Sequence, residues 1–120
     1  MNDLGKEAEK RGEIYLKKLG YKILDKNYTS PFGEIDIIAK ENKELVFIEI
    51  KFRSSNDFGM PKEFVGKNKQ SKIIKTALQY IKNRNLGKIG IRFDVLSMGP
   101  DLKETELIKS AFESPSTYVY

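Results

Sequence analysis

The 120-residue chain contains neither cysteine nor histidine. Their absence excludes disulfides, zinc sites with Cys or His ligands, catalytic thiols and nucleophile–histidine triads. Any bound metal must be a hard cation held by oxygen atoms, which favours Mg²⁺ or Mn²⁺. Any general base must be Lys, Asp, Glu or Tyr.

Long hydrophobic runs are lacking too. No segment approaches the roughly 20 apolar residues that span a bilayer, and the N-terminal "MNDLGKEAEKRGE" has no apolar core typical of an export signal. Hydrophobic residues make up 39% and charged residues 32%, which is typical of a globular protein. We therefore expect one soluble cytoplasmic domain over residues 1–120, with no membrane association.

The charge that is present is mainly positive. The formal net charge is +5 and the sequence pI is about 9.3. This balance favours a polyanionic partner, with nucleic acid as the first candidate. A lysine-rich surface that serves only solubility would explain the charge equally well.

Apolar periodicity predicts two helices, and alternation predicts several strands. The helices are expected at 3–19 and 67–83; the strands at a short part of 21–30, then 34–39, 45–53, 89–98 and 104–109. The order α-β-β-β-α-β-β predicts an α/β fold with a mixed central sheet flanked by helices. The segment from the third strand through the second helix has βαβ length, so strands 45–53 and 89–96 should be parallel.

The strand "LVFIEIKFR" (45–53) carries Glu49, Lys51 and Arg53 on one side although most of its residues are apolar. If the preceding hairpin turns tightly at residues 42–43, Asp36 lies directly across from Glu49. Like charges in that position destabilise a sheet, so the pair needs a compensating cation. Lys51 and a divalent metal are the two candidates.

The first helix offers a third carboxylate, because Glu9 lies at the rim of its apolar arc and can reach the edge of the sheet. Two or three carboxylates can hold Mg²⁺ against a scissile phosphate while a nearby lysine deprotonates or orients water. Phosphodiester hydrolysis by such a group needs no His or Cys. The alternative is a solvated Glu-x-Lys pair on an exposed strand; Asp36 in register and Glu9 favour the site.

The segment "GEIDIIAKENKELVFIEIKFRSS" (33–55), followed by F-G-x-P at 58–61, resembles the YraN-like family of predicted endonucleases. That family belongs to the PD-(D/E)xK, or restriction-endonuclease-like, superfamily, which also holds the archaeal Holliday-junction resolvases. The resemblance covers nearly the whole chain. It departs in the first helix, where the family usually has Gly-Glu-x-x-Ala and this chain has Ala8-Glu9-x-x-Gly12.

The resemblance implies a restriction-endonuclease-like fold and a role for each matching residue. Asp36 and Glu49 would be the metal-binding acidic pair, Lys51 the catalytic lysine and Glu9 the helix carboxylate, while Glu34 is a weaker candidate. The Ile50 carbonyl is expected to join the metal ligands.

Lys69, which matches the family's basic position on the second helix, is expected to contact phosphate, together with Lys72 and Arg53.

Three functions follow as hypotheses. The first is a Mg²⁺- or Mn²⁺-dependent nuclease, with DNA favoured over RNA. The second is a module on the nuclease fold that binds nucleic acid without cutting it. The third is an interaction protein that dimerises through the tail "TYVY" (117–120) or a sheet edge. A homodimer would also suit a junction-cutting enzyme, which must make two nicks.

Overall fold

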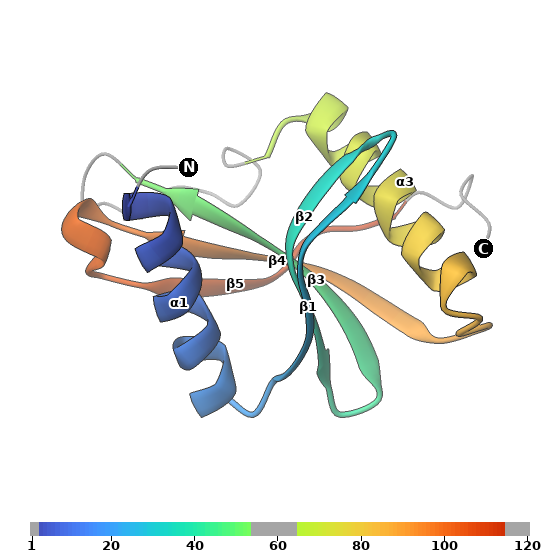
Figure 1. Ribbon diagram of the computed structural model, residues 1–120, viewed down its shortest axis with the longest axis horizontal. Coiled ribbons are helices and arrows are strands. Elements are labelled where there is room, and N and C mark those ends of the chain that lie inside the picture. Colours follow the sequence, from blue (N-terminus) through green and yellow to red (C-terminus); the bar gives the residue numbers. More distant parts are fainter. Residues whose placement is uncertain (1–2, 54–64, 115–120) are drawn as a thin grey trace.

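The computed structural model describes residues 3–53 and 65–114, which form a five-stranded mixed sheet with two α-helices packed on it (Figure 1). The elements are α1 (Asp3–Lys18), β1 (Lys22–Ser30), β2 (Gly33–Glu41), β3 (Glu44–Phe52), α3 (Lys67–Asn83), β4 (Gly90–Met98), the 3₁₀ turn η1 (Pro100–Leu102) and β5 (Glu106–Phe112). This confirms the α/β class and the predicted element order. The architecture is compatible with a restriction-endonuclease-like fold.

The strands lie in the order β1-β2-β3-β4-β5. Neighbours are antiparallel except β3 and β4, which run parallel from the pair Glu44–Gly90 to the pair Phe52–Met98. The connection between these two strands passes through α3, as expected of a βαβ unit. The predicted parallel pair is therefore confirmed.

The two helices cover opposite faces of the sheet. Leu16 of α1 belongs to one buried cluster, which includes Val46 and Ile48 of β3. Ile74 of α3 belongs to the other cluster, which includes Leu45 and Phe47 of the same strand. Strand β3 is thus apolar on both faces because both are covered, as is usual where a parallel pair lies inside a sheet. Side chains at alternate positions of β3 therefore point to α1 or to α3.

The β2–β3 hairpin turns over two residues, as predicted, since Glu41 pairs with Glu44 across Asn42 and Lys43. Asn42 has φ 54°, a left-handed conformation that Asn tolerates better than most residues and that suits this kind of turn. The ladder between the two strands continues as far as the pair Ile37–Ile48. Beyond it the strands separate: in Figure 1 the β1–β2 hairpin runs up beside α3, while the arrowhead of β3 points to the other side.

Three predictions about the strands need correction. Strand β1 has nine residues rather than a short stretch, because it pairs with β2 along its length. The last strand starts at Glu106 and extends to Phe112. Glu34, Asp36 and Ile38 do not share one face by simple alternation: Ile35 and Ile38 both pack on the side of α3, whereas Ile37 packs on the side of α1. The alternation breaks at Asp36, where the β3 ladder no longer constrains β2.

Of the helices in residues 3–53 and 65–114, neither is long and apolar enough to cross a membrane. The predicted loop 54–61 and the tail 117–120 lie outside the described residues.

Candidate active site where two strands separate

Asp36 and Glu49 lie at the point where β2 leaves β3. They follow the last ladder pair, Ile37–Ile48, so the ladder does not extend to the predicted Asp36–Glu49 pairing. The Ile50 backbone N–H donates a 2.8 Å hydrogen bond to Asp36 Oδ2, which fixes that carboxylate against β3. Both acidic residues line a cavity of about 560 Å³ that α3 borders with Lys69 and Lys72.

Glu49 is buried without full compensation for its charge. Its side chain is 7% exposed, and Oε1 has no hydrogen-bond partner among the described residues. Burial, followed by the negative charge of Asp36, raises the pKa of Glu49 to about 8. Buried carboxylates without partners are rare in proteins because desolvation penalises the charged form. The site therefore offers a cation both a cavity and a carboxylate whose negative charge is not fully compensated.

Glu49 forms an ion pair with Lys69, whose Nζ lies 3.8 Å from Glu49 Oε2. The Lys69 side chain is 56% exposed, so solvent screens the interaction and the pair contributes little. Lys51, the lysine expected to compensate the acidic pair, is exposed and makes no ion pair within the described part of the chain. Its position two residues after Glu49 on β3 puts it on the same face of the strand.

The donor set fits a hard divalent cation. No group of three Asp, Glu, His or Cys residues within the described ranges is close enough to hold a metal. Mg²⁺ does not require three, since it is commonly bound by one or two carboxylates, waters and substrate phosphates. Asp36 and Glu49 supply two carboxylates, one with a buried oxygen that has no partner in the described residues.

Glu9 approaches Asp36 from the other face of the sheet. It lines a second cavity, of about 220 Å³, together with Asp36 and Ile50. The Asn27 side-chain amide donates a 3.2 Å hydrogen bond to Glu9 Oε2. Glu9 lines this cavity on the side of α1, whereas Glu49 lines the one on the side of α3. Asp36 and the exposed Glu34 line both cavities.

Arg53 differs from the expectation that it contacts phosphate. It is 8% exposed, and its guanidinium donates hydrogen bonds to Ser97 Oγ and to the Glu104 carbonyl. These contacts join the end of β3 to β4 and to the segment before β5. The sequence could not reveal this, because the residues that cover Arg53 lie more than forty positions away. We therefore leave Arg53 out of the nucleic-acid surface.

Comparison with known proteins places the chain among bacterial relatives. Residues 8–98 match the family described as "Uncharacterised protein family UPF0102". The chain belongs to this family. It is also known as the YraN family, so the resemblance carried by residues 33–61 is confirmed.

Individual UPF0102 proteins are similar over most of their length. One from Syntrophus aciditrophicus is 44% identical over 111 residues, covering 91% of this chain and 87% of the relative. One from Thermodesulfovibrio yellowstonii is 47% identical over 110 residues, covering 92% and 96%. One from Clostridium acetobutylicum is 40% identical over 121 residues, covering 94% and 99%. The family description assigns no activity, so a function for UPF0102 has to be argued from the site.

Two residues at the site of this UPF0102 chain were not predicted from the sequence. Asn68 lines the α3-side cavity, and Asn27 bonds Glu9 in the α1-side region. Asn68 could have been found because it precedes Lys72 by four residues and so shares its helix face. Asn27 has φ 52° within β1, and a strand pattern gives no signal for such a residue.

Proposed function

We propose that this protein is a Mg²⁺- or Mn²⁺-dependent nuclease that hydrolyses phosphodiester bonds, with DNA favoured over RNA. The observation that carries the proposal is the Asp36–Glu49 pair at the separation of β2 and β3. One oxygen of this pair is buried without a partner in the described residues, beside a cavity that lysines border. A site built for a cation and a phosphate would have these properties.

In this proposal Asp36 and Glu49 would hold the cation, with the Ile50 carbonyl as a further oxygen ligand. A bound Mg²⁺ or Mn²⁺ would supply Lewis-acid polarisation of the scissile phosphate. The hydrogen bond from Ile50 N–H keeps Asp36 in position for this role before substrate arrives.

The remaining residues would act on water and on the phosphates. Lys51 would orient the attacking water and help remove its proton, as the bond from water oxygen to phosphorus forms and the bond to the leaving nucleotide oxygen breaks. Glu9 would orient water or the metal from the side of α1. Lys69 and Lys72 would hold the flanking phosphates, because both are exposed at the border of the cavity.

The test is a panel of labelled DNA and RNA substrates, single-stranded, duplex, flapped and branched, incubated with Mg²⁺, Mn²⁺ or chelator. We expect cleavage that needs the metal and that Lys51→Ala and Asp36→Ala abolish, while salt-sensitive binding is largely retained. Binding of these substrates by the metal-loaded protein with no cleavage of any of them would contradict the proposal.

One observation favours a second candidate, a module that binds nucleic acid without cutting it. Helix α3 carries five lysines and no acidic residue, which is a binding surface whether or not the carboxylates act. Binding that neither chelator nor Glu49→Ala changes, combined with the absence of cleavage, would select this function instead.

A further inference from the structure

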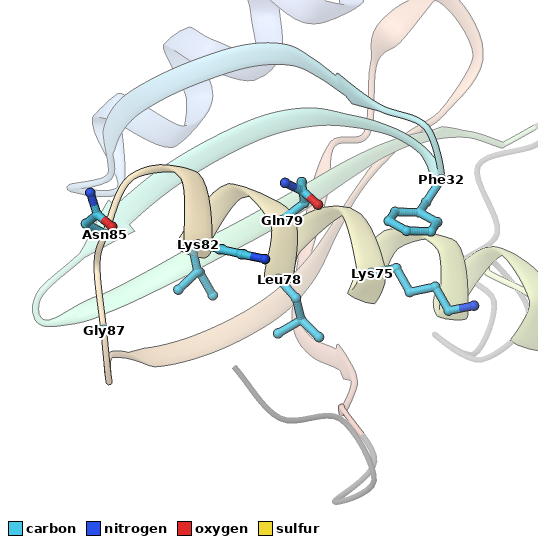
Figure 2. Close-up of a pocket in the computed structure, with 8 residues that line it drawn as sticks. Phe32, Lys75, Leu78, Gln79, Lys82, Asn85 and Gly87 are labelled. Atoms are coloured by element: carbon cyan, nitrogen blue, oxygen red, sulfur yellow. The ribbon is translucent and has the colours of Figure 1, made fainter.

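The largely apolar cavity on the outer side of α3 adjoins the candidate active site. It has a volume of about 460 Å³ and is lined by residues of α3, of the loop after it and of the β1–β2 turn, among them Phe32, Lys75, Leu78, Gln79 and Lys82. Figure 2 shows Phe32 beside Lys75, with Leu78, Gln79 and Lys82 further along the helix and Asn85 and Gly87 at its far end.

The same two elements line this cavity and the Asp36–Glu49 cavity. In the β1–β2 hairpin, Gly33 borders the Asp36–Glu49 cavity and Phe32 borders the outer one. In α3, Lys72 borders the first and Lys75 the second. Residues three apart on a helix lie about one turn, roughly 5 Å, along the same face. The outer cavity is thus the next step along α3 from the carboxylates.

Phe32 is exposed, yet the turn that carries it is fixed to α3. The residue is 44% exposed, so part of its ring is accessible to solvent. Ser30 Oγ accepts a hydrogen bond from Phe32 N–H and lies 2.9 Å from Thr76 Oγ1 of α3. Lys75 Nζ lies 5.8 Å from the centre of the Phe32 ring. The ring is therefore held in a defined place and partly exposed, with the Lys75 ammonium over it.

These features suit a nucleotide. A base can stack on an exposed aromatic ring whatever its identity, and a lysine beside the ring can bind the adjoining phosphate. The apolar side chain of Leu78 offers a surface for the base. Gln79 Nε2 donates to Asn83 Oδ1, and the Gln79 amide oxygen can accept a hydrogen bond from the edge of the base. A paired base inside a duplex has no free face for such stacking.

Resting on the proposed nuclease function, we propose that the outer cavity binds one unpaired base next to the scissile phosphate, with Phe32 as the stacking platform and Lys75 and Lys82 as phosphate contacts. The substrate is then single-stranded nucleic acid, or a structure with an unpaired nucleotide at the cleavage point. Fully paired duplex lacks the group that this cavity recognises.

The chain contains no tryptophan, so Phe32→Trp introduces a single fluorescent reporter at the stacking position. With chelator present to prevent cleavage, a single-stranded oligonucleotide should quench this fluorescence, and a duplex of the same sequence should quench it far less. Leu19→Trp is the matched control, because Leu19 is 47% exposed just after α1, the helix on the opposite face of the sheet. Equal quenching by single strand and duplex, or quenching at both positions, would overturn the proposal.

Affinity gives a second readout. Phe32→Ala should weaken single-strand binding about tenfold and duplex binding less than about twofold, since a tenfold change corresponds to about 1.4 kcal/mol, within the range for one stacked base. Lys75→Ala with Lys82→Ala should lower the slope of log affinity against log salt by about 1.4 for single strands. Unchanged single-strand affinity in Phe32→Ala would overturn the proposal.

These binding experiments do not depend on turnover. If Phe32→Trp reports stacking but no substrate is cut, the base site stands and the nuclease proposal fails. If substrates are cut but Phe32 has no effect on single-strand binding, the nuclease proposal stands and the base site fails.

Discussion

Two buried carboxylates on neighbouring strands of the same sheet have opposite surroundings. Asp94 of β4 is fully buried, and both its oxygens have partners. Arg92 donates to Oδ1 and Oδ2 at 2.9 Å each, Tyr21 OH donates to Oδ2 at 3.1 Å, and the Ser110 backbone N–H donates to Oδ1 at 3.1 Å. Glu49 of β3 has one oxygen without a partner in the described residues and a second near an exposed lysine.

The difference separates a structural group from a functional one. Arg92 also contacts Glu41 and Glu44, so the Asp94 network joins the β2–β3 hairpin to β4 and to Tyr21, the residue just before β1. Hydrogen bonds to Asp94 raise the pKa of Arg92, and burial raises that of Tyr21, so both stay protonated. Protein groups satisfy Asp94 completely. At Glu49 that compensation is incomplete, as expected where a ligand supplies the rest.

The largest contrast should be in catalysis. Glu49→Gln or Asp36→Asn should reduce metal-dependent cleavage by about 10³-fold or more, since each removes a charge that the proposed reaction needs. Both variants should fold. Initial rates on the most readily cut substrate measure this, with Asp94→Asn as control at equal concentrations of folded protein. A loss of comparable size in the folded Asp94→Asn protein would erase the distinction between the two regions.

The second contrast is in stability. Asp94→Ala should lower the free energy of unfolding by about 3–5 kcal/mol, because it leaves the Arg92 charge and the Tyr21 hydroxyl partly unpaired. Glu49→Ala should cost much less, since a carboxylate with an unsatisfied oxygen contributes little to folding. Urea denaturation of the two metal-free variants measures the difference. Equal destabilisation would show that Glu49 is as well compensated as Asp94.

A third effect is on the pH dependence of stability. The pKa of Glu49 is raised from 4.5 to about 8, so between these values the unfolded chain loses a proton that the folded metal-free protein keeps. The free energy of unfolding should therefore fall, by up to about 4 kcal/mol, as the pH rises from about 5 to about 8. Glu49→Gln should remove this decline. Urea midpoints across the range give the result; an unchanged pH profile in the variant would assign the decline to other groups.

The smallest effect concerns Lys69. Lys69→Ala should change stability by less than about 1 kcal/mol, since its ion pair with Glu49 is exposed. It should reduce the slope of log affinity against log salt by about 0.7 for single strands and about 0.9 for duplex. Anisotropy titrations at several salt concentrations measure this slope, with Lys40→Ala, an exposed lysine on β2, as the control. No change in slope would remove Lys69 from the phosphate contacts.

The sequence predicts the acidic pair because local rules determine it. A two-residue turn at 42–43 sets the register of the hairpin up to the pair Ile37–Ile48, and Asp36 and Glu49 come directly after that pair. The parallel β3–β4 pair follows from the length of the crossover in the same way. These features depend on neighbours in the chain, which a pattern can show.

Other features depend on distant segments. The burial of Arg53 requires Ser97 and the segment near Glu104. That Lys69, rather than Lys51, makes the ion pair with Glu49 follows from how α3 packs on the sheet. The break in alternation at Asp36 arises because β2 separates from β3, and no periodicity in "GEIDIIA" indicates where that occurs. The Asp94 network likewise joins residues up to 73 positions apart.

Mn²⁺ binding tests most directly whether the charge of Glu49 is incompletely compensated because a cation binds at this site. Isothermal titration of Mn²⁺ into the wild type, Glu49→Gln and Asp94→Asn at pH 8, without substrate, compares the two regions in one experiment. We expect saturable binding to the wild type and to folded Asp94→Asn, and its loss in Glu49→Gln. Equal Mn²⁺ binding by Glu49→Gln and the wild type, or none by the wild type, would contradict this account.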